Sequence, residues 1–141
     1  MKPLLLLSFF SLLNLSIDRS SQICRTWKQI GFKGFHKEYK PIHPSMAEVI
    51  TFKNDGTYDK VLYGQMSIKG DWRFDQDSTK LNMAVTTVNG ARVGGMTIKE
   101  SKPIDTILRL TKDTLVLGTL AYYGASKEYG HDDLYFVAEG Q

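Results

Sequence analysis

The amino-acid sequence predicts an all-β protein, an antiparallel up-and-down β-barrel of about eight strands. Apolar and polar residues alternate in 70–74 and again in 81–85, on either side of a turn rich in Asp and Ser. Alternation with a period of two around a turn is typical of an antiparallel hairpin with one buried face. The same arrangement recurs around Asp55 and around Asp113. Three such hairpins, with no helical period between them, favour a closed antiparallel barrel.

The first residues are predicted to direct export. Lys2 precedes an apolar run from Leu4 to Leu15, about the length of a signal-peptide core and shorter than the roughly 20 residues that span a bilayer. We expect residues 1–22 to be a signal peptide, and residues 23–141 to form the barrel of a periplasmic or extracellular protein. A lipid anchor on Cys24 is the alternative.

The first half of the barrel domain contains three informative features. Trp27 lies in the first predicted strand, where it can plug one end of a barrel. Residues 33–47 carry two prolines and are predicted to form a long loop, a flap over the barrel mouth. Asn54-Asp55-Gly56 is typical of a three-residue hairpin loop with its glycine in the left-handed conformation. In strand 57–63, Lys60 shares the parity of the apolar residues, which predicts an edge strand or a bulge.

In the second half, Asn89-Gly90 predicts a tight turn between strands 80–88 and 91–99. Gly94-Gly95 lies inside the second of these strands and indicates a bulge or a barrel corner. Residues 121–132 are predicted to be irregular, and 133–138 to form the last strand. An earlier strand is expected to have four residues on one face: Ile104, Thr106, Leu108 and Leu110.

Composition excludes several classes of partner and site. A formal net charge of +3 is too small to indicate a nucleic-acid partner. A single cysteine, Cys24, excludes an internal disulfide and a cysteine-cluster zinc site. The fold must therefore be stabilised by its hydrophobic core.

No pattern in the sequence indicates catalysis. No Ser, His and acid set has diagnostic spacing, and Gly94-Gly95 lacks the strand–loop–helix context of a phosphate site. His36, His43 and His131 could bind a divalent ion if the long loops met, but their separation in sequence favours solvated loop residues. We therefore expect neither an enzyme nor a metal or cofactor site.

Aromatic side chains supply the candidate ligand site. A barrel of eight strands is just wide enough to be filled by its own side chains or to hold one small ligand. Because Lys69, Asp71 and Arg73 are expected to face water, Trp72 and the residues of its parity face the interior. The candidate ligand-binding residues are Trp27, Tyr58, Trp72, Phe74, Met83 and Tyr135.

Four motifs follow one another along most of residues 23–138. They are Trp27 in the first strand, Ile-Thr-Phe-x-x-Asp-Gly-Thr-Tyr at 50–58, Gly-Asp-Trp at 70–72, and Leu-x-Leu-x-x-Asp-Thr-Leu-Val-Leu at 108–117. Together they resemble the bacterial lipocalin-like domains, small exported barrels of the calycin type.

The chain departs from the typical lipocalin pattern in three respects, one of which is that the Thr-Asp-Tyr motif before the penultimate strand is missing. Lipocalins have Gly two residues before the first-strand Trp, where this chain has Arg25. They also place an Arg in or after the last strand to stack on that Trp, and residues 133–141 contain none.

The sequence thus predicts an exported lipocalin-like barrel that binds a small apolar or amphipathic ligand in its interior. The alternative is a protein-interaction module with a filled barrel and no small-molecule ligand. No membrane span is expected in either case.

Overall fold

The computed structural model describes residues 18–34, 37–95, 97–101, 105–123 and 128–140. Short α1 (Arg19–Ile23) precedes the first strand, and the 3-10 helix η1 (Pro44–Met46) lies between the second and third. Ten strands follow the chain in order: β1 (Thr26–Lys33), β2 (Tyr39–Pro41), β3 (Val49–Phe52), β4 (Thr57–Leu62), β5 (Met66–Phe74), β6 (Lys80–Val88), β7 (Ala91–Arg92), β8 (Asp105–Leu110), β9 (Thr114–Tyr123) and β10 (Glu128–Ala138).

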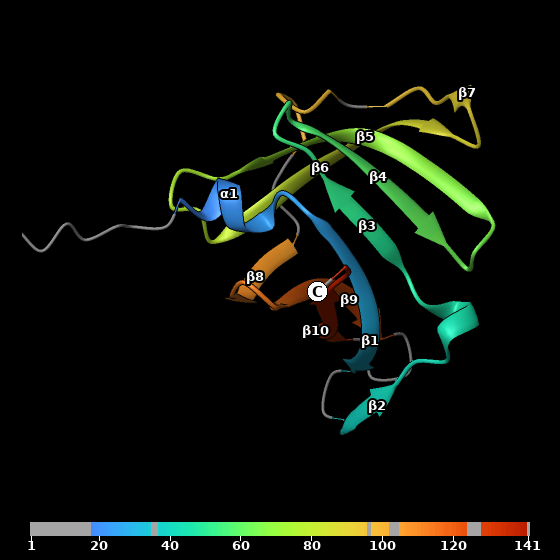
Figure 1. Cartoon of the computed structure of the whole chain (residues 1–141), viewed down its shortest axis with the longest axis vertical. Coiled ribbons are helices and arrows are strands. Elements are labelled where there is room, and N and C mark those ends of the chain that lie inside the picture. The colour runs from blue at the N-terminus through green and yellow to red at the C-terminus, as the bar shows by residue number, and fades with distance from the viewer. Residues whose placement is uncertain (1–17, 35–36, 96, 102–104, 124–127, 141) are drawn as a thin grey trace, which may run out of the picture.

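The strands form a closed antiparallel barrel, as the sequence predicts (Figure 1). Neighbours in the barrel run β10-β9-β8-β6-β5-β4-β3-β1, and pairing of β1 with β10 closes it. Two short strands lie outside this ring: β2 pairs with the end of β1, and β7 pairs with the end of β6. Closure pairs nearly every strand on both edges, which removes the exposed edges of an open sheet.

Two predicted turns are confirmed by their backbone conformation. Gly56 has φ +83°, the left-handed value expected of it between β3 and β4. Asn89 and Gly90 have φ values of 48° and 80°, as a primed two-residue turn between β6 and β7 requires.

Bulges explain where the predicted strand faces are wrong. An extra residue in β8 puts Ile107 opposite Leu117 and Arg109 opposite Val116. Leu108 is therefore 53% exposed, whereas Ile107 is 7% exposed, the reverse of the predicted parity. A similar shift in β6 accompanies Val85, which is 39% exposed despite sharing the parity of Leu81. Bulges change the parity of a strand without an obvious mark in sequence.

Three predicted segments also differ in extent. The strand expected over 91–99 ends after Arg92, and the chain then runs back along β6 (Figure 1). Most of the irregular segment expected at 121–132 is strand in β9 and β10, although 124–127 lie outside the described residues. The loop expected at 33–47 contains β2, whose Tyr39 ring packs edge-on against Tyr135 rather than forming a flap.

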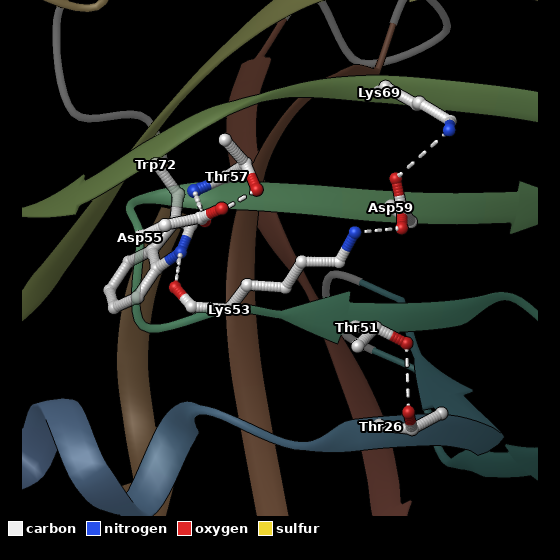
Figure 2. A network of polar contacts seen from close by, with 8 residues as sticks. All are labelled: Thr26, Thr51, Lys53, Asp55, Thr57, Asp59, Lys69 and Trp72. Carbon is white, nitrogen blue, oxygen red and sulfur yellow. Dashed lines mark hydrogen bonds and ion pairs between the residues drawn. The ribbon is translucent and has the colours of Figure 1, made fainter.

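Polar contacts on the outer wall join four neighbouring strands (Figure 2). The hydroxyls of Thr26 and Thr51 lie 2.8 Å apart between β1 and β3. Asp59 on β4 accepts ion pairs from Lys53 at 2.5 Å and from Lys69 on β5 at 3.9 Å. These contacts lie on the face opposite the core, so the outer wall is polar here.

Candidate functional site

Four of the six predicted ligand-binding residues lie together at one end of the barrel interior. Trp27, Tyr58 and Trp72 are 0%, 2% and 7% exposed, and Phe74 packs against them. Phe52 connects the group, because its ring centroid lies 5.4 Å from that of Trp72 and 6.4 Å from that of Tyr58. The rings therefore form a continuous aromatic floor, defined here as Trp27, Phe52, Tyr58, Trp72 and Phe74.

Both indoles in the floor are hydrogen-bonded to backbone carbonyls. Trp27 Nε1 donates to Ile23 O at 2.9 Å, and Trp72 Nε1 donates to Lys53 O at 3.0 Å. Ile23 is 0% exposed, so α1 covers this end of the barrel. Figure 2 shows the Trp72 ring beside the β3–β4 turn, with its nitrogen directed at Lys53. These contacts fix the floor as a closed end.

The other two predicted residues have separate positions. Met83 on β6 is paired with Trp72 and packs against the edge of the core. Tyr135 alternates with the inward-facing Leu134 and Phe136, and its ring meets Tyr39 at a centroid distance of 5.2 Å. Since its neighbours on both sides face inward, Tyr135 lies on the outer wall, apart from the other five.

Gly70 gives the floor its close packing. A Cβ placed on Gly70 would lie 2.8 Å from Cε1 of Tyr58, and still closer to the Ala84 carbonyl. The space beside Trp72 that a glycine would leave open is thus occupied by the Tyr58 ring. A ligand inside the barrel would accordingly lie beyond Tyr58, toward the opposite end.

The inward positions toward that opposite end are polar. Lys60 is directly paired with Ile50, which is 1% exposed, so its side chain points to the interior face. Lys60 Nζ lies 2.8 Å from Oε1 of Glu48, and both side chains are mostly buried. Gln29 adds to this wall, since its Oε1 accepts a hydrogen bond from the backbone N–H of Glu48.

A second polar wall comes from β8 and β9. Asp105 is paired with Leu81, which is 1% exposed, so it too points inward. Thr119 has the parity of the buried Leu117, and its hydroxyl donates to Asp105 Oδ1 at 3.1 Å. We call Gln29, Glu48, Lys60, Asp105 and Thr119 the polar layer.

Electrostatic effects connect the two walls. Burial raises the pKa of the Asp105 carboxyl, the Thr119 hydrogen bond and the charge of Lys60 lower it, and Glu48 raises it. Lys60 lies on β4 and Glu48 directly precedes β3, and these two strands are on the far side of the ring from β8, so the walls face each other across the interior. Burial also raises the pKa of Tyr58 to about 12, with smaller effects from nearby carboxylates.

The sequence pattern contained one signal for this layer. Lys60 shares the parity of Tyr58 and Leu62, a pattern whose interpretation from sequence is an edge strand or a bulge. That interpretation is wrong, because β4 pairs in unbroken register with both β3 and β5. The lysine faces inward because Glu48, 12 residues earlier in the chain, is there to pair with it. Neither Glu48 nor Asp105 has a local signature that predicts this.

Comparison with known proteins supports the fold. No protein-family model matches the chain, and no curated protein sequence matches it. Among solved structures the chain is similar to a DUF4847 family protein from Bacteroides vulgatus, at 17% sequence identity. The TM-score is 0.51, over 85% of this chain and 96% of that one. At such low identity the likeness extends to the fold alone.

Among the described residues, no three His, Cys, Asp or Glu side chains form a group that could hold a metal ion. His43 caps η1, and His131 lies exposed on β10, while His36 is outside the described residues. No helix within the described ranges is long and apolar enough to cross a membrane.

Proposed function

We propose that the protein is an exported, lipocalin-like barrel that binds a small amphipathic ligand inside. The observation that carries this proposal is the polar layer above the aromatic floor. A molecule with an apolar body and a polar head would place the body against the floor. Its head would then reach Lys60, Glu48 and Asp105.

Energetics favour this proposal over a barrel interior that is merely structural. Ionised side chains lose hydration when they turn inward, and an ion pair recovers this loss only in part. Apolar residues at the same positions would fill a barrel at least as stably. Charged groups retained inside are therefore better explained by contact with a polar ligand or its water.

The lipocalin-like part of the proposal gains support from Arg25. Its guanidinium carbon lies 5.7 Å from the centroid of the Trp27 ring, and Nη1 donates to the carbonyl of Lys112 in the β8–β9 turn. Typical lipocalins place an arginine from the end of the chain on the first-strand tryptophan. Here an arginine two residues before the tryptophan occupies an equivalent position and ties β1 to the opposite wall.

Export is the remaining part of the proposal. It is supported by Lys2 and the apolar run Leu4–Leu15, which have the order and length of a signal peptide.

Titration of the full chain with dodecanoic acid and dodecylamine tests interior binding. In a Trp27→Phe background, Trp72 is the remaining tryptophan, and its fluorescence should change saturably at micromolar ligand. Lys60→Met, combined with Glu48→Gln so that no charge is left unpaired, should weaken binding of at least one ligand several-fold. Lys69→Met is the matched control, because Lys69 lies on the outer wall. Equal binding by the two variants, or no binding at all, would overturn the proposal.

A protein-interaction module is the second candidate, and one observation favours it. Three large apolar side chains on β8, β9 and β10 are at least half exposed: Leu108 at 53%, Leu120 at 50% and Tyr129 at 70%. Such side chains are common at protein interfaces when they lie close together. A well-folded protein that binds neither amphiphile would make this candidate the leading one.

A further inference from the structure

A segment of chain forms an arch over the outside of β6. This arm, described at residues 93–95 and 97–101, leaves the sheet after β7 and is fixed at both ends. At its start, Val93 N donates to Thr86 O at 3.0 Å. At its far end, Asn82 Nδ2 donates to the carbonyls of Ile98 and Ser101 at 3.2 and 2.7 Å. Ser101 Oγ donates back to Asn82 Oδ1. Asn82 is only 1% exposed, so the arm is docked by a buried polar contact.

A pocket of about 660 Å³ lies between the arm and the wall of the barrel. Asp71 of β5 and Ala84 and Thr86 of β6 contribute the wall side, and the arm contributes the other. Small residues leave this space open, since a Cβ on Gly94 or Gly95 would meet no atom within 4 Å. The volume is within the range of small-molecule sites. This pocket is separate from the barrel interior, where Trp72 and Lys60 lie.

The pocket is lined by charges of both signs that other contacts leave available. Asp71 belongs to the wall, while Arg92 of β7 and Lys99 of the arm stand around it. In the described part of the chain, none of these three takes part in a hydrogen bond or an ion pair through its side chain. By contrast, Asp59 on the neighbouring strand is paired with two lysines (Figure 2).

Register sets the separation of these charges. Asp71 is paired with Ala84, and Arg92 with Thr87, three residues farther along β6. The β6 bulge puts Thr87 opposite Lys69, so Asp71 and Arg92 are offset by two residues of β5, roughly 7 Å along the strand at ~3.3 Å per residue. They also lie on opposite sides of β6, roughly 10 Å apart across the sheet, so their backbones are about 12 Å apart. An extended tripeptide covers about the same distance. Apolar contact is available in between from Ala84, Val93 and Ile98.

We infer that this pocket binds a short apolar peptide with free termini. Its ammonium group pairs with Asp71, and its carboxylate pairs with Arg92 and Lys99. The apolar side chains of the peptide contact the residues between these charges. A peptide carboxylate can accept two parallel hydrogen bonds from an arginine guanidinium, and a peptide ammonium can donate charge-assisted hydrogen bonds to a carboxylate. Both ends of the ligand are thus recognised by charge, and the distance between them selects its length.

Calorimetric titration of the full chain with the tripeptide Leu-Ala-Leu tests this inference. We expect saturable binding that weakens tenfold or more on N-acetylation of the peptide, and again on C-amidation. Asp71→Asn should weaken binding of the free peptide tenfold or more and should make N-acetylation nearly without effect. Arg92→Gln should likewise weaken binding of the free peptide tenfold or more, and it should make C-amidation nearly without effect. Asp59→Asn, on the same outer wall but away from the pocket, is the control.

Three results would overturn the inference: no binding at millimolar peptide, equal binding of free and capped peptides, or equal losses in Asp71→Asn and Asp59→Asn. Thermal melting of each variant identifies a loss that comes from unfolding, and Thr86→Val then gives a milder change within the pocket. The Lys60→Met, Glu48→Gln variant should bind Leu-Ala-Leu normally. The two sites can therefore fail or succeed independently.

Discussion

Asp105 shows how a single side chain can oppose stability and still be retained. Its carboxyl points inward with one hydrogen bond, from Thr119, and burial raises its pKa above the ordinary value. An unfolded chain therefore releases the Asp105 proton at lower pH than the folded protein does. As pH rises through the ordinary carboxyl pKa toward the raised value, Asp105 increasingly destabilises the fold. Below that window it has no such effect.

Asp105→Asn should therefore be no less stable than wild type at pH 7. Its advantage should disappear below the ordinary carboxyl pKa, where both proteins carry a neutral side chain at this position. Urea unfolding of both proteins from pH 3 to pH 8 measures this difference. If the two proteins keep a constant difference in unfolding free energy over that range, the carboxyl is not titrating in the buried environment described here.

Gly56 is a second residue whose role can be isolated. Its φ of +83° is unfavourable for any side chain, and most of all for a β-branched one. A Cβ there would have space, because the nearest atom lies 3.8 Å away. Gly56→Val should therefore lower the free energy of unfolding by about 1–3 kcal/mol through backbone strain alone. Gly56→Asn, which tolerates this conformation, should cost clearly less. Similar losses in both variants would point to a steric cause instead.

At the level of elements, sequence alternation predicted the faces of strand segments that contain no bulge and whose inward residues are apolar. β5 and the start of β6 are the clearest cases, since Trp72 faces Met83 as their parities require. Prediction failed at the β8 bulge, where Leu108 turns outward, and at the short β7. A bulge depends on how two strands meet, which no single strand records.

The arm is an element that alternation could not have predicted, because its far end is held by the buried side-chain amide of Asn82. Asn82→Ala removes three hydrogen bonds, to the carbonyls of Ile98 and Ser101 and to the Ser101 hydroxyl. Water must then replace the amide as their partner. We expect the free energy of unfolding to fall by about 1–3 kcal/mol. Limited proteolysis within residues 93–101 should become faster, and Leu-Ala-Leu binding should be lost. Thr87→Ala, on the same strand, is a control. An arm that stays protected in Asn82→Ala would show that other contacts hold it.

For the whole molecule, the barrel was predictable and the site was not. A closed antiparallel barrel follows from repeated hairpins whose strands pair with their neighbours in sequence. The polar layer instead joins Glu48 and Lys60 with Asp105 and Thr119 from the opposite wall. Their approach depends on barrel closure and on the β8 bulge, which places Asp105 and Ile107 inward. Neither condition can be deduced from local pattern.

Closure of the barrel end also bears on the proposed signal peptide, because it depends on residues that precede β1. Asp18 caps α1, Ile23 is fully buried, and its carbonyl accepts the Trp27 indole. A chain that begins at Asp18 keeps these contacts. A chain that begins at Cys24 loses the Ile23 side chain, and the Trp27 indole N–H loses its hydrogen-bond acceptor. We expect the shorter chain to be less stable by about 2–4 kcal/mol.

Cleavage of the proposed signal peptide is accordingly expected at or before Asp18, earlier than the boundary after residue 22 that the sequence alone predicts, and after the apolar run Leu4–Leu15. Intact mass and N-terminal sequencing of protein secreted from cells that express the whole chain would locate it. Urea unfolding of the two truncated chains measures the stability difference. Incorporation of labelled fatty acid that Cys24→Ser abolishes would contradict this prediction, since a lipid-anchored protein begins at its cysteine and has no α1.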